Sequence, residues 1–207
     1  MPLATRLTET LGIRHPILLA PMGSVAGGAL AGAVTAAGGL GLIGGGYGDS
    51  EWLEREFAAA GNHRVGCGFI TWSLARRPEL LAQALAHGPA AVMLSFGDPK
   101  PFAPAIKQAG ATLICQVQTL AHVDDALAAG AEIIVAQGSE AGGHGATRAT
   151  LPLVPQVVDR VRRRAPEAMV VAAGGIGDGR GDNSHQRVRH GARHHLARAV
   201  HRPRAQQ

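Results

Sequence analysis

A single histidine stands in a glycine-rich loop directly after an apolar, strand-like run, in the stretch IIVAQGSEAGGHGAT of residues 133–147. This histidine is His144, and an imidazole can take or give a proton near neutral pH. Glu140 in the same loop is an alternative base, although its carboxylate could equally order the loop by accepting backbone N–H bonds. An ordinary solvated loop histidine is a further interpretation. We favour His144 as the base because its loop lengthens the connection after a strand, where parallel α/β folds place their sites.

Two other motifs follow apolar runs in the same way. Gly174 and Gly175 end the run MVVAAGG, where backbone N–H groups without a neighbouring Cβ can approach a phosphate; a plain tight turn fits them as well. Pro21 and Met22 end the run PILLAPM, and the small residues after them would let a flat ligand lie close, although Met22 also suits a core position.

Three glutamines occupy positions at or near strand ends: Gln116, Gln118 and Gln137. A buried amide must be hydrogen-bonded, and a heterocycle with alternating donors and acceptors would satisfy it. Gln116 and Gln118 are two residues apart and therefore face the same way if their strand continues.

The elements that must position these residues form a regular series. Apolar runs alternate with alanine- and leucine-rich segments that end at glycine, as helices do. This order predicts parallel strands covered by helices, which fits a doubly wound sheet or a (β/α)8 barrel, and the even spacing favours the TIM-type barrel. The seven expected strands lie within residues 16–22, 39–45, 64–70, 90–96, 111–117, 131–137 and 169–176.

The pattern stops after the seventh run. We therefore expect an incomplete barrel over residues 1–181 that lacks its last unit, and a basic, unstructured tail over residues 182–207 with no strand. Residues 180–207 carry seven Arg and one Asp, so the formal net charge of +5 lies in the tail. A nucleic-acid arm and a metal site at His190, His194 and His195 are weaker interpretations. A change of reading frame near Gly181 would also explain this composition.

Bulk composition limits the remaining classes. An aromatic content of 3% argues against a protein that reads nucleic acid by stacking bases. Cys67 and Cys115 both lie in apolar runs, as reduced core thiols do. The first residues show no secretory apolar segment, and no apolar run reaches the length of a membrane span, so we expect a cytoplasmic protein without a membrane partner.

Taken together, the motifs LLAPMGSVAGG, GCGFITW, AQGSEAGGHGAT and AAGGIGDGRG, in this order and spacing, resemble the nitronate monooxygenase family, formerly called 2-nitropropane dioxygenases, over residues ~8–181. The resemblance implies an FMN-containing TIM barrel that oxidises alkyl nitronates or nitroalkanes with O2 to a carbonyl compound and nitrite, without a metal. The implied substrate is a small molecule, and no oligomeric state is specified. The alternatives are an FMN-dependent enoyl-ACP reductase, which is a related barrel, and an inactive truncated remnant.

The same resemblance implies roles for individual residues. His144 would be the active-site base or electrostatic host, and the cofactor would be bound by Ala20, Pro21, Met22, Gln116, Gln118, Gln137, Gly142, Gly143, Gly174 and Gly175. The family's glycine-threonine turn after the eighth strand has no match here. We therefore expect this chain to bind FMN weakly or not at all.

Overall fold

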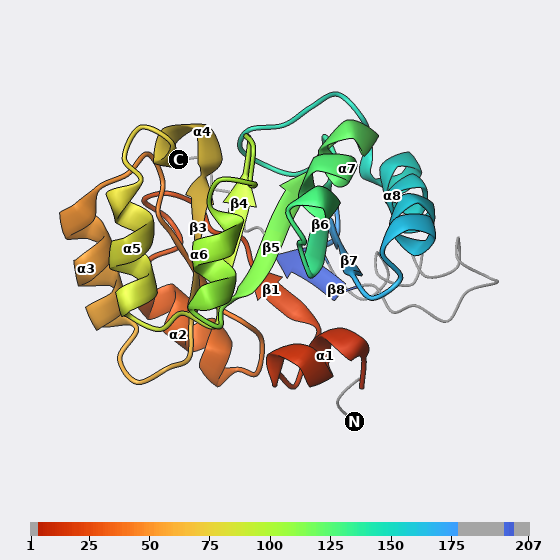
Figure 1. Ribbon diagram of the computed structural model, residues 1–207. Helices are drawn as coiled ribbons and strands as arrows, with labels where there is room; N and C mark the ends of the chain where they lie inside the picture. Colours follow the sequence, from red (N-terminus) through yellow and green to blue (C-terminus); the bar gives the residue numbers. More distant parts are fainter. Residues whose placement is uncertain (1–3, 178–196, 201–207) are drawn as a thin grey trace, which may run out of the picture.

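The computed structural model describes residues 4–177 and 197–200. Its strands all run parallel in one sheet, and helices pack around that sheet (Figure 1). The strands are β1 Ile17–Leu19, β2 Leu42–Gly44, β3 Gly66–Ile70, β4 Ala91–Ser95, β5 Thr112–Val117, β6 Ile133–Gln137, β7 Met169–Ala173 and β8 Ala197–Val200. The helices are α1 Arg6–Leu11, α2 Gly28–Ala36, α3 Ser50–Ala59, α4 Thr71–Leu74, α5 Glu79–Ala86, α6 Ala103–Gln108, α7 Leu120–Ala128 and α8 Thr150–Arg164.

The strand order is that of a (β/α)8-type barrel, as expected. The sheet runs β1-β8-β7-β6-β5-β4-β3-β2. A further parallel bridge joins Leu18 to Leu40, where the Leu19 N–H donates to the Leu40 carbonyl at 2.9 Å. This bridge links β1 to the residues just before β2, so the pairings connect the strands in a full circuit.

The structure corrects the expectation that no strand follows Gly181. Residues 197–200 form β8, which pairs with β1 and with β7 and so occupies the position of the last strand, which we expected to be missing. Four residues with the sequence ARAV are too short to show an apolar period, but backbone N–H and C=O groups alone can fill a gap between two strand edges. The expected boundary at 181/182 and the tail histidines lie outside the described residues.

Helix ends follow from local sequence. Thr5 and Thr8 form a capping box at the start of α1, and Asp49 caps α3 by accepting the Trp52 N–H at 2.9 Å. Gly38 and Gly130 follow α2 and α7 with positive φ, which is the left-handed conformation that ends a helix.

Two apolar clusters fill the molecule because successive strand residues point to opposite faces. One cluster lies between the sheet and the helices and contains Ile134 and Ala136 of β6. The other fills the barrel interior, contains Ile133 and Val135 of the same strand, and includes Leu7 and Leu11 of α1. Helix α1 therefore covers the end of the barrel at which the strands begin.

Both cysteines are free and buried, as expected for core thiols. Burial raises the pKa of the Cys67 and Cys115 thiols to about 12 each. No helix within the described residues has both the length and the apolar character that crossing a bilayer requires.

Candidate active site

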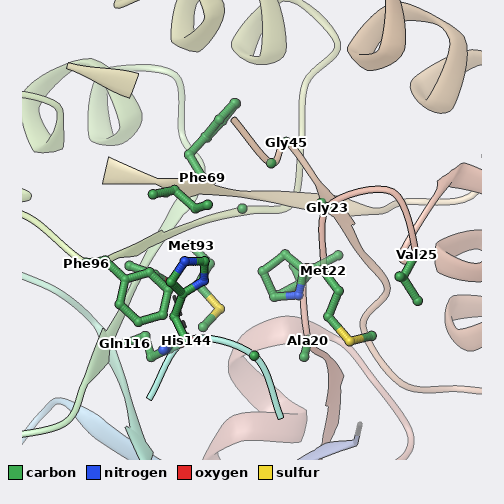
Figure 2. Close-up of a pocket in the computed structure, with 18 of the residues that line it drawn as sticks. Ala20, Met22, Gly23, Val25, Gly45, Phe69, Met93, Phe96, Gln116 and His144 are labelled. Atoms are coloured by element: carbon green, nitrogen blue, oxygen red, sulfur yellow. Dashed lines mark hydrogen bonds between the residues drawn. The ribbon is translucent and has the colours of Figure 1, made fainter. Parts of the chain in front are cut away.

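A cavity of about 740 Å³ opens at the carboxyl ends of the strands, opposite α1. Its size falls in the range of about 300–1,000 Å³ that is usual for small-molecule sites. Figure 2 shows Ala20 and Met22 on one side of it and Phe96, Gln116 and His144 on the other. Nine residues that the sequence singled out line this cavity: Ala20, Pro21, Met22, Gln116, Gln137, Gly142, Gly143, His144 and Gly174.

Small residues on the inner face of β2 and β3 make room for the first-strand segment. A Cβ atom at Gly44 would collide with the backbone of Met22, and one at Gly68 would collide with the Pro21 ring. The APM segment can therefore lie flat against the neighbouring strands, with Met22 at the cavity wall.

The three glutamines form one hydrogen-bonded group. The Gln137 Oε1 accepts from the Nε2 groups of Gln116 and of Gln118, the latter at 2.7 Å, and the Ser95 hydroxyl donates to Gln116 Oε1 at 3.3 Å. Gln116 and Gln118 thus converge, as their spacing predicts. Gln118, however, is buried behind the cavity wall and is not part of the lining.

These hydrogen bonds determine which atom of the Gln137 amide can still bind a ligand. Its oxygen accepts two bonds, whereas its Nε2 makes no hydrogen bond to any described residue. Gln137 lines the cavity, so it can present an N–H donor to an acceptor on a bound heterocycle.

His144 lies exposed at the cavity mouth. Its Nε2 is 3.3 Å from the Tyr47 hydroxyl oxygen, and its ring centroid is 5.4 Å from that of Phe96, with the planes tilted by 48°. Gly143 precedes it with φ of 84°, and a Cβ there would meet nothing within 4 Å, so the loop backbone beside the imidazole is bare. A ligand in the cavity can reach both the ring and this backbone.

Glu140 is placed differently from His144. It does not line the cavity; its Oε2 accepts the Thr150 N–H at 2.8 Å and the Thr150 hydroxyl at 2.9 Å, and Ser139 Oγ lies 3.3 Å away. Burial raises the pKa of Glu140, but the bonds from Thr150 and Ser139 outweigh it and leave the pKa below its ordinary value. Glu140 thus orders the loop and the start of α8, which disfavours it as the base.

The glycine pair after β7 needs glycine at both positions. Gly174 has φ of 115°, and a Cβ there would lie 2.6 Å from Thr150 Oγ1 and 2.9 Å from the Ala141 nitrogen. Gly175 has φ of 70° and lies beside Glu140 rather than in the cavity lining. The bare backbone at this rim suits an anion such as a phosphate.

Comparison with known proteins identifies the family. The sequence profile described as nitronate monooxygenase matches residues 4–62 and 73–188. The chain belongs to this family. The GCGFITW motif, residues 66–72, falls entirely in the gap between the two matched ranges, which contain the other three motifs.

Two curated relatives with different names are similar to this chain. Nitronate monooxygenase of Neurospora crassa is 33% identical over 209 residues, which cover 81% of this chain and 55% of the relative. The (3aS,4S,5R,7aS)-5-hydroxy-7a-methyl-1-oxo-octahydro-1H-indene-4-carboxyl-CoA dehydrogenase of Mycobacterium tuberculosis is 32% identical over 188 residues, which cover 87% of this chain and 51% of the relative. The chain spans about half the length of these curated relatives.

Solved structures show the same barrel. FabK from Thermotoga maritima superimposes with a TM-score of 0.80 at 29% identity, over 95% of this chain and 61% of that one. Nitroalkane oxidase from Streptomyces ansochromogenes superimposes with a TM-score of 0.73 at 26% identity, over 92% of this chain and 66% of that one.

Aromatic residues at the cavity were missed by the sequence reasoning. Four of the seven aromatic side chains in the chain line it: Tyr47, Trp52, Phe69 and Phe96. Tyr47 follows a triple glycine after the second apolar run, a position equivalent to that of the other candidates, and this position was the available signal. Within the described residues, no cluster of three His, Cys, Asp or Glu could hold a metal ion.

Proposed function

We propose that this chain is the barrel of an FMN-dependent oxidoreductase that oxidises alkyl nitronates or nitroalkanes with O2 to a carbonyl compound and nitrite. The observation that carries the proposal is the position of His144 at the mouth of a cavity whose walls include glycine backbone, aromatic rings and Gln137, whose Nε2 makes no hydrogen bond to a described residue. Membership of the nitronate monooxygenase family supports it.

The cavity walls fit a flat cofactor. Ala20, Pro21 and Met22 would lie against one face of the ring system, and the free N–H of Gln137 would donate to a ring acceptor. Gln116 and Gln118 would hold Gln137 in that orientation. The bare backbone of Gly142 and Gly143 would adjoin the cofactor, and that of Gly174, which lines the cavity, would bind its phosphate, with Gly175 just outside the lining. When bound, FMN would supply the electron acceptor and deliver the electrons to O2.

His144 would serve the two substrate forms in different ways. A neutral nitroalkane must lose the proton on its α-carbon, and the imidazole would accept that proton. A preformed nitronate is an anion, and the imidazolium form would hold it. Among the described residues that line the cavity there is no Lys or Arg, and Asp49 is the sole carboxylate, so His144 would carry both tasks.

A second candidate is an enoyl-ACP reductase-like enzyme that reduces a thioester with NAD(P)H. It is favoured by the TM-score of 0.80 to FabK and by the relative that is named as a carboxyl-CoA dehydrogenase. The two candidates share the cavity and the histidine but differ in electron donor.

The deciding experiment is a flavin titration followed by a turnover assay. The purified chain is titrated with FMN while flavin absorbance and fluorescence are recorded, and is then given a nitroalkane, its nitronate, or NADPH with an enoyl thioester. Nitrite release from the nitro compounds supports the proposal, and NADPH consumption with the thioester supports the second candidate. If FMN leaves both spectra unchanged, the cofactor proposal fails, and the expectation of weak or absent FMN binding that the missing glycine-threonine turn suggested is confirmed. Gly145→Ala serves as the control for substitutions in the glycine-rich loop, because a Cβ at position 145 meets nothing within 4 Å.

A further inference from the structure

Tyr47 and His144 reach each other from opposite sides of the barrel. Tyr47 follows β2 and His144 follows β6, and these two strands stand four places apart in the circuit of eight. The contact between the Tyr47 hydroxyl and His144 Nε2, at 3.3 Å, therefore spans the cavity mouth.

The tyrosine side of this contact is held from behind. The Tyr47 carbonyl accepts the hydroxyl of Ser73 at 2.9 Å, and its ring packs on Trp72 with centroids 5.9 Å apart. The next carbonyl, of Gly48, accepts from Arg77 Nη1 at 2.6 Å. The phenol is exposed, but its backbone is fixed to α4 and to the residues that follow it, so its position is defined.

The histidine side is held as well. The His144 carbonyl accepts from Gln118 Nε2 at 3.2 Å, and its ring lies against Phe96. Phe96 has φ of 63°, a strained conformation for a bulky residue, and its carbonyl accepts the Trp72 N–H at 3.3 Å. Tyr47, Trp72, Phe96 and His144 are therefore connected in a closed series of contacts, in which Trp72 lies outside the cavity lining.

Tyr47 contacts one of the two imidazole nitrogens of His144 and makes no hydrogen bond with the other. Nε2 of His144 faces the phenol oxygen, whereas Nδ1 has no hydrogen-bond partner among the described residues. In a neutral imidazole one nitrogen carries the proton and the other carries the lone pair, and the partner of one nitrogen decides the role of the other.

We propose that Tyr47 is a positioning residue that assigns the two imidazole nitrogens of His144 to separate tasks. The contact allows either direction, and in the proposed assignment Nε2–H donates to the Tyr47 oxygen, which leaves the Nδ1 lone pair for the substrate. Nδ1 takes the proton from the α-carbon, and the electron pair of the broken C–H bond stays on the substrate, which becomes the nitronate. Nε2 keeps its proton, which remains hydrogen-bonded to the Tyr47 oxygen. This inference rests on the proposed role of His144 as the base.

The first test needs no flavin and no substrate. The ¹⁵N chemical shifts of the imidazole nitrogens are recorded on ¹⁵N-histidine-labelled chain at a pH where imidazole is neutral, and the His144 signals are those absent from His144→Gln. We expect a single Nε2–H tautomer in the unmodified chain and a mixture in Tyr47→Phe, with the two shifts moving toward each other. Unchanged His144 shifts in Tyr47→Phe would overturn the inference.

Trp52→Phe is the matched control for this measurement. Like Tyr47→Phe, this variant replaces a cavity-lining residue with Phe and removes a hydrogen bond. In Trp52 that bond runs from Nε1 to the Gly44 carbonyl at 3.0 Å. Its ring makes no recorded contact with His144, so its His144 shifts should equal those of the unmodified chain. A tautomer mixture in Trp52→Phe as well would mean that any change in the cavity wall disturbs the imidazole, which would also overturn the assignment to Tyr47.

The second test separates the proton transfer from the rest of turnover. With flavin bound, Tyr47→Phe should lower kcat on a neutral nitroalkane about tenfold, a part of the roughly 10²–10⁴-fold that a positioned base contributes. The rate on the preformed nitronate should stay within about twofold, because no C–H proton is removed there. An equal loss on both substrates would overturn the inference. Absence of turnover in the unmodified chain would instead reject the proposed function, while the tautomer measurement would still test Tyr47.

Discussion

The two ends of the barrel are built from the same strands but have opposite properties. At the end where the strands begin, Leu7 and Leu11 of α1 pack onto Leu18 and Leu40, and all four side chains are almost completely buried. At the end where the strands finish, a cavity of about 740 Å³ remains. The two ends of the barrel therefore differ in the side chains that lie inside it, while the strands that form both ends are the same.

Two strands show how the change occurs. The inner face of β6 presents Ile133, then Val135, then Gln137. On β4, Met93 of the inner cluster is followed two residues later by Ser95 at the cavity. On these two strands the apolar inner side chains give way to a polar one at the end, so both strands supply core and site.

The largest expected effect lies at the open end. We expect His144→Gln to lower the rate on a neutral nitroalkane by about 10²–10⁴-fold, because the proton acceptor is lost. The free energy of unfolding should change by less than about 0.5 kcal/mol, because the imidazole is exposed. Nitrite release measures the first quantity and urea unfolding the second. Full activity in this variant would remove His144 from the mechanism.

At the closed end the expected effect falls on stability instead. Leu11→Ala should lower the free energy of unfolding by about 2–5 kcal/mol, because it leaves a cavity beneath α1. Leu151→Ala is the matched control, since Leu151 is 49% exposed, and should cost less than about 0.5 kcal/mol. Equal costs in urea unfolding would mean that α1 does not seal the barrel.

Gly174 lies at the rim of the open end, and its substitution tests whether glycine is required there. Gly174→Ala should lower the free energy of unfolding by about 1–3 kcal/mol, because φ of 115° is strained for alanine and its Cβ would press on Thr150 and Ala141. The same substitution should weaken FMN binding in a fluorescence titration. Gly145→Ala in the neighbouring loop should change neither quantity, and a similar loss in that control would argue against a specific demand at Gly174.

The smallest effect is a pH dependence of the loop. The Glu140 pKa is lowered in the folded chain, so its bonds to Thr150 stabilise the loop above the ordinary carboxyl pKa of 4.5 and are lost as the pH falls through the lowered folded pKa. Hydrogen exchange of residues 138–150 should therefore accelerate in acid. Glu140→Gln should exchange faster at neutral pH and show less acid dependence, and identical profiles for the two chains would contradict this anchoring role.

Most of the fold was predictable because it follows from periodic patterns. Each of the strands β1 to β7 lies within one of the seven apolar runs, since buried parallel strands need continuous apolar sequence and helices that end at glycine separate them. β8 was not predictable, because four residues carry no measurable period and its position depends on two neighbouring strand edges.

The site was predictable to the extent that strand ends converge. Parallel strands finish at one end of the barrel, so glycine, glutamine and histidine residues that follow apolar runs could be expected to meet there, and most of those predicted do line the cavity. Tyr47 and Phe96 were missed because their importance lies in contacts across the mouth: the Tyr47–His144 bond joins residues 97 positions apart. Gln118 was predicted to contribute to cofactor binding; the structure buries it outside the cavity lining, a position that spacing alone does not reveal.

The two buried cysteines have a consequence for durability. Peroxide and other oxidants attack the thiolate form of cysteine, and a pKa of about 12 keeps Cys67 and Cys115 almost entirely as thiols at neutral pH. Both side chains also lie in the layer between sheet and helices, on the far side of the strands from the cavity. A barrel that handled oxygen at one end would thus keep its two cysteine thiols shielded from the reactive by-products of that chemistry.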